Sequence, residues 1–138
     1  MLNQFSRTEL LYGKEAMERL ANARVAIFGL GGVGGYTAEA LARSGVGTFD
    51  LIDDDKVCLT NINRQLLALH STIGKSKVQV AKDRIHDIDE DIIVHTYEVF
   101  YNEDTEGMFD FGAYDYIVDA IDTVTSKLLI IAQAKEHH

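Results

Sequence analysis

The sequence predicts an α/β fold of the Rossmann type: a doubly wound, mainly parallel sheet with helices on both faces. Apolar strand-like segments alternate with helical periodicities, and this alternation is typical of a parallel sheet. One strand-like segment runs directly into the glycine-rich turn from Gly29 to Gly34. A helical pattern, a second apolar segment and Asp53 follow it, which is the context that supports a G-x-G-x-x-G nucleotide motif.

The first half of the chain contains a helical segment and a strand–helix–strand unit. Residues 1–22 place apolar side chains at helical spacing, so they predict one or two amphipathic helices, which Gly13 interrupts. The short apolar run within 24–30 predicts a buried strand. Residues 33–44 follow a helical period, and the apolar segment 48–53 predicts a second strand that ends on an acid.

The second half continues the alternation after a polar stretch, residues 54–74, that has no clear period. Residues 76–88 space their apolar side chains as a helix does, and the apolar runs at 92–99 and 116–120 predict two further strands. A last helix is expected at about 124–136, where the apolar residues have helical spacing.

Two parts are expected along the chain: an N-terminal helical segment, 1–22, and a nucleotide-binding Rossmann-like domain, 23–138. The last helix should cross over to a further parallel strand, and no such strand follows in the sequence. We therefore expect an N-terminal portion of a longer family domain whose C-terminal half is absent. His137 and His138 fit either a native helix end or a tag remnant.

Composition and charge exclude several classes of protein. The 138 residues fit one domain, and 46% hydrophobic with 25% charged residues is ordinary for a globular protein. Thirteen basic against twenty-two acidic residues give a net charge of −9, which argues against nucleic-acid binding by bulk electrostatics alone. The single cysteine, Cys58, excludes a disulfide framework, and we expect it to be a small buried group. Without a membrane-length apolar stretch or signal-peptide pattern, a cytoplasmic protein is expected.

Each glycine of the motif is needed for a physical reason. Gly29 allows a tight turn, Gly31 lets a phosphate approach the backbone, and Gly34 lets helix and strand pack closely. The helix that follows offers unpaired N–H groups and the positive end of its dipole to an anion. Asp53 lies where a carboxylate can accept hydrogen bonds from ribose hydroxyls. The motif indicates a nucleotide without indicating which one.

The polar stretch favours a polyphosphate ligand. A dehydrogenase would normally continue from its ribose acid into another crossover helix, whereas this chain has Asn61, Arg64 and Gln65 close together in sequence. Lys77 follows at the start of the next helix. Arginine offers a rigid fork of donors and lysine a point charge, and this pairing suits a polyphosphate.

An acid beyond the last predicted strand completes the set. Asp119 and Asp122 come at and just past its end, and loops at the carboxyl ends of strands are where doubly wound folds bind ligands. A carboxylate at this place can hold Mg²⁺ together with phosphate oxygens. Glycine loop, ribose acid, Arg64, Lys77 and acid together describe a site for ATP and Mg²⁺ without a Walker sequence.

Four motifs in this order resemble a known family. They are Gly-Leu-Gly-Gly-Val-Gly from Gly29, Asp-x-Asp-x-Val-x-x-x-Asn-x-x-Arg-Gln from Asp53, Gly-x-x-Lys from Gly74, and Ala-Ile-Asp ending at Asp122. The chain is thereby similar to the ThiF/MoeB/HesA superfamily, which is related to ubiquitin-activating enzymes. Within it, four segments most resemble the tRNA threonylcarbamoyladenosine dehydratase branch, namely residues 5–11, 39–47, 61–65 and 119–124.

The resemblance implies roles for particular residues. It implies an ATP site built from the glycine loop, the ribose acid and the polar stretch: Gly29, Gly31, Gly32, Gly34, Asp53, Asn61, Arg64, Gln65 and Lys77. It assigns the chemistry to Arg7, Arg64, Lys77 and Asp122. Asp122 is the implied ligand of Mg²⁺, and Arg7 is implied to reach the ATP of the other subunit in a homodimer.

The function implied by the resemblance is ATP-dependent adenylation of a carboxylate. The expected substrate is threonylcarbamoyladenosine in tRNA, which would close to a cyclic, dehydrated form. One alternative is the C-terminal glycine of a ubiquitin-like sulfur-carrier protein, so the expected partner is tRNA or such a carrier. A second alternative is an NAD-dependent oxidoreductase, against which the polar stretch argues. A third is a non-catalytic binding module, against which intact Arg64, Lys77 and Asp122 argue.

Overall fold

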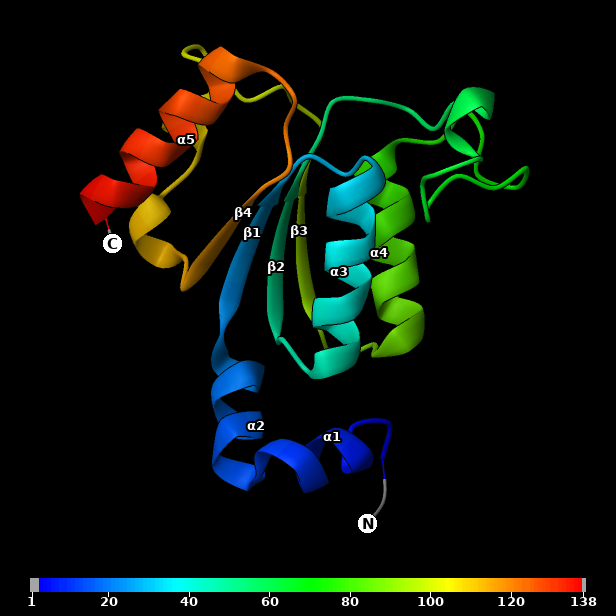
Figure 1. The fold of residues 1–138 in the computed structure, drawn as a ribbon, viewed down its shortest axis with the longest axis vertical. Coiled ribbons are helices and arrows are strands. Elements are labelled where there is room, and N and C mark those ends of the chain that lie inside the picture. Colours follow the sequence, from blue (N-terminus) through cyan, green and yellow to red (C-terminus); the bar gives the residue numbers. More distant parts are fainter. Residues whose placement is uncertain (1–2, 138) are drawn as a thin grey trace.

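Four parallel strands form the centre of the computed structural model, which describes residues 3–137 (Figure 1). They are β1 (Arg24–Phe28), β2 (Thr48–Ile52), β3 (Ile93–Tyr97) and β4 (Tyr116–Asp119). Their order across the sheet is β3-β2-β1-β4, and every neighbouring pair is parallel. The predicted α/β, Rossmann-like fold is therefore confirmed.

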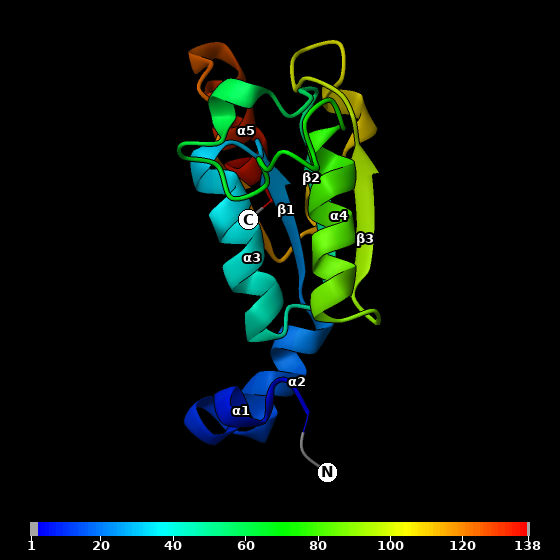
Figure 2. The same cartoon turned by 90° about the vertical axis from the view of Figure 1, so that its right-hand side faces the viewer.

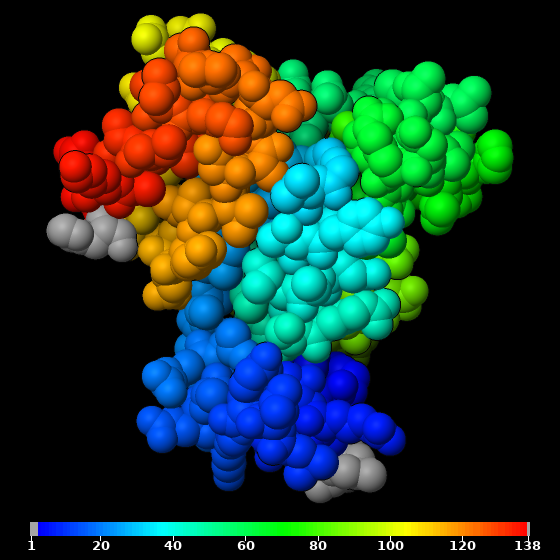
Figure 3. Space-filling view, in the orientation of Figure 1, coloured from blue at the N-terminus to red at the C-terminus, as the bar shows by residue number. Residues whose placement is uncertain are grey.

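Helices cover both faces of the sheet, as expected. α3 (Gly32–Ser44) and α4 (Lys77–Ile88) pack on one face, and α5 (Val124–His137) lies on the other (Figures 1 and 2). Residues within 1–22 form two short helices, α1 (Ser6–Tyr12) and α2 (Lys14–Asn22), which Gly13 separates. These two helices form the lower lobe of the molecule, at the amino ends of the strands (Figure 3).

Alternate residues of the central strands enter two separate cores. Val25 and Ile27 of β1 belong to the core under α3 and α4, whereas Ala26 and Phe28 belong to the core under α5. Such two-sided burial is what a parallel sheet with crossover helices requires. The strand ends at Phe28, earlier than the predicted range 24–30, because Gly29 leaves the extended conformation with a φ of 97°.

Within residues 3–137, none of the helices combines the length and the apolar character that crossing a bilayer requires.

A buried ion pair links the centre of the sheet to the segment before β4. Asp50 lies in the middle of β2 and is completely buried, and Arg24 of β1 binds both of its carboxylate oxygens at 2.9 Å. The Tyr114 hydroxyl donates to the same carboxylate at 3.4 Å, and the Arg24 guanidinium lies 5.4 Å from the Tyr114 ring centroid. Hydrogen bonding to Asp50 raises the pKa of Arg24 further, so this cation stays charged.

Replacing Asp50 by alanine should lower the free energy of unfolding by about 3 kcal/mol, because Arg24 remains half-buried without its partner. The double variant Arg24→Met/Asp50→Leu should recover most of this loss, since it removes both charges. Urea denaturation measures both effects. Asp104→Ala, at an exposed aspartate, is the control and should stay within about 0.5 kcal/mol of wild type. If Asp50→Ala and Asp104→Ala lowered the free energy of unfolding equally, the role of the Arg24–Asp50 pair would be contradicted.

Candidate functional site

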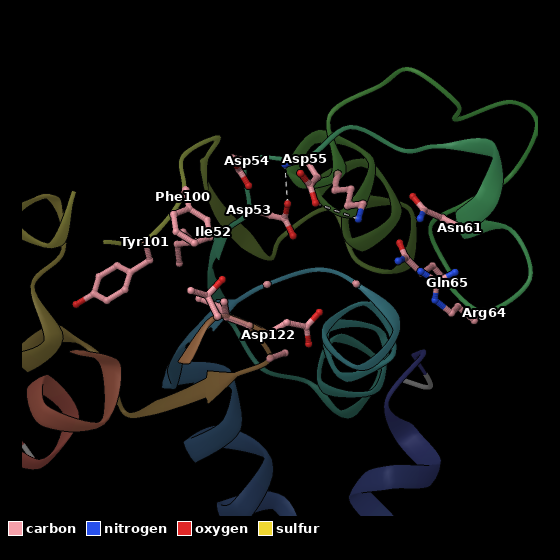
Figure 4. A pocket seen from close by; sticks show the side chains of 16 residues that line it. Ile52, Asp53, Asp54, Asp55, Asn61, Arg64, Gln65, Phe100, Tyr101 and Asp122 are labelled. Atoms are coloured by element: carbon pink, nitrogen blue, oxygen red, sulfur yellow. Dashed lines mark hydrogen bonds and ion pairs between the residues drawn. The ribbon is translucent and has the colours of Figure 1, made fainter. Parts of the chain in front are cut away.

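A pocket of about 320 Å³ opens at the carboxyl ends of the strands (Figure 4). After β1, the chain builds β2 and β3 on one side of it and β4 on the other. The connection from β3 to β4 therefore crosses back past β1, so the strand order reverses there, and doubly wound folds bind ligands in the crevice at such a switch point. Residues following all four strands line this pocket.

The glycine loop holds the backbone close to the β4–α5 loop. A Cβ atom at Gly29 would lie 2.6 Å from the Ala120 carbonyl oxygen, and Gly29 also has a positive φ. A Cβ atom at Gly34 would collide with the Gly29 carbonyl. Gly31 precedes the first turn of α3, and the amides of that turn have no intrahelical acceptor. This geometry leaves backbone donors beside the pocket, where an anion can bind them.

Asp53 ties the glycine loop to the end of β2. Its carboxylate accepts hydrogen bonds from the amides of Leu30 and Asp55, each at 2.7 Å. Burial is the largest influence on this group and raises its pKa, although the two amides and the attraction of Lys77 oppose the change. Asp53 therefore has a structural role in addition to lining the pocket.

The polar stretch 54–74 folds back on itself rather than forming a helix. Val57 donates to the Lys75 carbonyl at 2.9 Å, and the Lys77 amide donates to the Asp55 carbonyl at 3.0 Å. This pairing places the start of α4 beside the end of β2. The Lys77 side chain is only 6% exposed and lines the pocket, and its single ion pair within residues 3–137 is a long one, 3.8 Å to Asp55.

Three polar residues of the stretch line the same side of the pocket. The Asn61 carboxamide oxygen accepts a hydrogen bond from the Cys58 amide at 2.9 Å, which leaves its NH₂ group available. Arg64 is exposed and donates to the Thr60 carbonyl at 3.0 Å. Gln65 is buried, and its Oε1 atom has no hydrogen-bond partner among residues 3–137. The side chains of Asn61, Arg64 and Gln65 lie together in Figure 4.

The opposite wall is apolar and was not anticipated from the sequence. Ile52, Phe100 and Ile121 line it, and exposed Asp122 lies next to Ile121 at its rim. The Tyr101 ring also contributes, but its hydroxyl points away from Asp122 (Figure 4). Phe100 follows β3, so the rule that ligands bind beyond strand carboxyl ends was a signal that could have identified it.

The structure does not bring every predicted residue to the pocket. Gly32 and Gly34 support the turn without lining the cavity. Arg7 lies on α1, at the opposite end of the sheet from the pocket (Figure 1). The expectation that Cys58 is buried is wrong: its side chain is exposed, because it precedes the surface turn Leu59–Asn61, in which no residue is buried.

Comparison with known proteins identifies the family to which this geometry belongs. The ThiF family matches residues 5–138, nearly the whole chain. The chain belongs to the ThiF family. Individual relatives confirm the predicted resemblance to this superfamily and to its tRNA threonylcarbamoyladenosine dehydratase branch.

A tRNA threonylcarbamoyladenosine dehydratase of Bacillus subtilis is 52% identical over 134 residues, which are 96% of this chain and 52% of the relative. The crystal structure of Escherichia coli tRNA N6-threonylcarbamoyladenosine dehydratase in complex with ATP has a TM-score of 0.93 at 40% identity and covers 96% of this chain and 55% of that one. Adenylyltransferase and sulfurtransferase MOCS3 of Culex quinquefasciatus is 35% identical over 92% of this chain and 29% of its own length. The chain spans about half the length of the two dehydratases.

The raised pKa of Asp53 predicts a pH dependence of stability. A carboxyl group with a raised pKa binds its proton more tightly in the folded than in the unfolded state, so its contribution to stability falls as the pH rises above its ordinary pKa of 3.8. The free energy of unfolding of wild type relative to Asp53→Asn should therefore decrease over this range. Urea titrations at a series of pH values test this, with Asp54→Asn, at an exposed position, as the control. The prediction is contradicted if the difference in free energy of unfolding between wild type and Asp53→Asn stays constant or increases with pH.

Proposed function

We propose that this chain provides the ATP-binding part of an enzyme that adenylates a carboxylate. The observation that carries the proposal is Lys77: a nearly buried ammonium group lines the pocket and, in the part of the chain that the structure describes, has only a distant carboxylate for a partner. A buried cation is stable only when it is paired, so the site favours an anionic ligand. The first turn of α3 presents backbone donors to the same space.

The pocket offers a complementary surface for each part of ATP. The apolar wall of Ile52, Phe100 and Ile121 suits a purine base, and Asp53 lies where it can accept from a ribose hydroxyl. Lys77, with the Asn61 amide and Arg64 guanidinium, suits the phosphates, and Gly32 and Gly34 shape the loop beneath them. Gln65 lies beside this group.

Asp122 fits the role of a Mg²⁺ ligand. Its carboxylate is exposed at the rim of the pocket, and Mg²⁺ in proteins is usually held by one or two carboxylates together with phosphate oxygens. When bound, Mg²⁺ would neutralise charge on the phosphates. Asp53, Asp54 and Asp55 form a second group of nearby carboxylates, but two backbone amides already use Asp53.

The proposed reaction has two steps. A carboxylate oxygen attacks the α-phosphorus of ATP, the bond to the β-phosphate bridging oxygen breaks, and pyrophosphate leaves, so that an acyl-adenylate forms. Lys77 and Arg64 stabilise the charge that develops on the phosphates. In the second step a nucleophile attacks the activated carbonyl and AMP leaves. Catalysis therefore rests on positioning and electrostatics rather than on a covalent enzyme intermediate.

The carboxylate that we favour belongs to threonylcarbamoyladenosine in tRNA. The support is the 52% identity to one dehydratase and the 0.93 TM-score to another that was crystallised with ATP. Attack by a group within the same substrate would close a ring and expel AMP, which amounts to loss of water from the substrate. We expect the enzyme to meet its tRNA substrate in the cytoplasm.

A second candidate substrate is the C-terminal glycine of a ubiquitin-like sulfur-carrier protein. The similarity to an adenylyltransferase and sulfurtransferase favours it, at a lower identity of 35%. An NAD-dependent oxidoreductase is disfavoured, because the carboxamide and guanidinium groups of Asn61 and Arg64 and the ammonium of Lys77 gather at one side of the pocket as a polyphosphate requires.

The full-length protein should exchange radioactive pyrophosphate into ATP only when its carboxylate substrate is present. The test compares tRNA carrying threonylcarbamoyladenosine, the same tRNA without the modification, and a carrier protein with a C-terminal glycine. Exchange with the modified tRNA alone supports the favoured substrate. Cleavage of ATP to ADP and phosphate, without AMP, would rule out adenylation.

Matched variants extend this experiment. Lys77→Met should weaken transition-state stabilisation on the order of 2–4 kcal/mol, because it removes a charge-assisted phosphate contact. Arg64→Ala should act in the same direction. Cys58→Ala is the control, since the thiol is exposed and does not line the pocket, and its exchange rate should match wild type.

Arg7 is proposed to act across a homodimer, because it lies far from the pocket of its own chain. Two inactive full-length variants, Arg7→Ala and Asp122→Ala, should then complement when mixed. Random exchange makes half of the dimers mixed, each with one intact site, so about a quarter of wild-type activity should return. If subunit exchange is demonstrated by mass spectrometry and no activity returns, Arg7 does not act in the partner's site.

A further inference from the structure

The loop that carries Asp122 is attached to the first turns of α5 by an ion pair. The Lys127 ammonium lies 3.1 Å from the Oδ1 atom of Asp119, which is the last residue of β4. The same Oδ1 atom accepts a hydrogen bond from the Ile121 amide at 3.3 Å. One oxygen atom thus connects the end of the strand, the loop before Asp122 and the helix after it.

The pair has a second, electrostatic effect. Asp119 precedes Asp122 by three positions, so an unpaired Asp119 would add negative charge next to a carboxylate that is proposed to bind a metal and phosphates. Lys127 neutralises that charge without lining the pocket. Its side chain is 38% exposed and that of Asp119 is 22% exposed. Pairs this accessible contribute little to global stability, so the main consequence of the pair is local geometry.

Both ends of the loop are anchored, and the Ile121 side chain packs on the core under α5. On one side Ala120 lies against Gly29, and its amide bonds to the Phe28 carbonyl at 2.8 Å. On the other side the Lys127 amide bonds to the Thr123 carbonyl at 3.0 Å. Asp122 lies between these two anchored ends. Among residues 3–137, the side-chain hydrogen bond to this loop comes from Asp119, whose carboxylate is in turn paired with Lys127.

We propose that Lys127 is a positioning residue, which acts through Asp119 to hold the Asp122 loop in the geometry that binds Mg²⁺ with ATP. This inference rests on the proposed ATP-binding function. It assigns Lys127 no direct contact with substrate. Residues that orient metal ligands typically change metal affinity about 10- to 100-fold when they are replaced.

Amide hydrogen exchange in the ligand-free, full-length protein tests the positioning directly. In Lys127→Met, the amides of residues 120–123 should exchange several-fold faster than in wild type, while those of β1 remain unchanged. Lys127→Arg should restore slow exchange because it keeps the charge. The matched control is Lys135→Met, which removes an exposed lysine from the same helix and should leave residues 120–123 unaffected. Unchanged exchange in Lys127→Met would overturn the proposal.

Calorimetric titration of the same variants with ATP tests the consequence for the metal. Lys127→Met should raise the Mg²⁺ concentration needed for half-maximal enhancement of ATP binding by roughly tenfold, and leave ATP binding in EDTA unchanged. An equal loss of affinity with and without Mg²⁺ would instead indicate that Lys127 touches the phosphates, and would overturn the proposal. Absence of ATP binding in wild type would refute the ATP-binding function, whereas the hydrogen-exchange result would still decide whether Lys127 holds the loop.

Discussion

The close approach of two loops at the carboxyl end of β1 is the constraint on which the rest of the site depends. Gly29 leaves no space for a side chain beside the Ala120 carbonyl, and Gly34 leaves none beside the Gly29 carbonyl. The strand, the start of α3 and the end of β4 can therefore meet in one small region. Because they meet, backbone donors of α3 and the carboxylate of Asp122 face the same pocket although they are distant in sequence.

Much of the fold follows from local patterns in the sequence. The alternation of apolar runs and helical periods indicates the parallel sheet, and the glycine spacing indicates the turn after β1. Errors are confined to element ends, as at Phe28, where the apolar run continues but the backbone turns. Asp50 was missed for a different reason: a single acid within an apolar strand gives no indication of its partner, because Arg24 is on another strand.

The candidate site could be predicted less completely than the fold. Charged and polar members such as Arg64 and Lys77 stand out because their residue types suit phosphate. Phe100 and Ile121 do not stand out, since apolar residues after a strand are ordinary in any core. The exposure of Cys58 was also beyond prediction, because it depends on how the stretch 54–74 pairs residues 55–57 with residues 74–77, and a stretch without periodicity does not specify this pairing.

The two hydrogen bonds that Asp53 accepts from backbone amides mean that an acid at this position does not by itself indicate nucleotide binding. A residue that only touched a ribose would become free to vary in a protein that lost its nucleotide. Asp53 also holds the Leu30 amide of the glycine loop and the Asp55 amide after β2, so a descendant that no longer binds any ligand would still need a carboxylate here to keep the turn closed. The acid is therefore a marker of the folded turn, and inactive members of the fold should retain it. Lys77 is the better marker of retained chemistry, because its ammonium group lacks a close partner among residues 3–137.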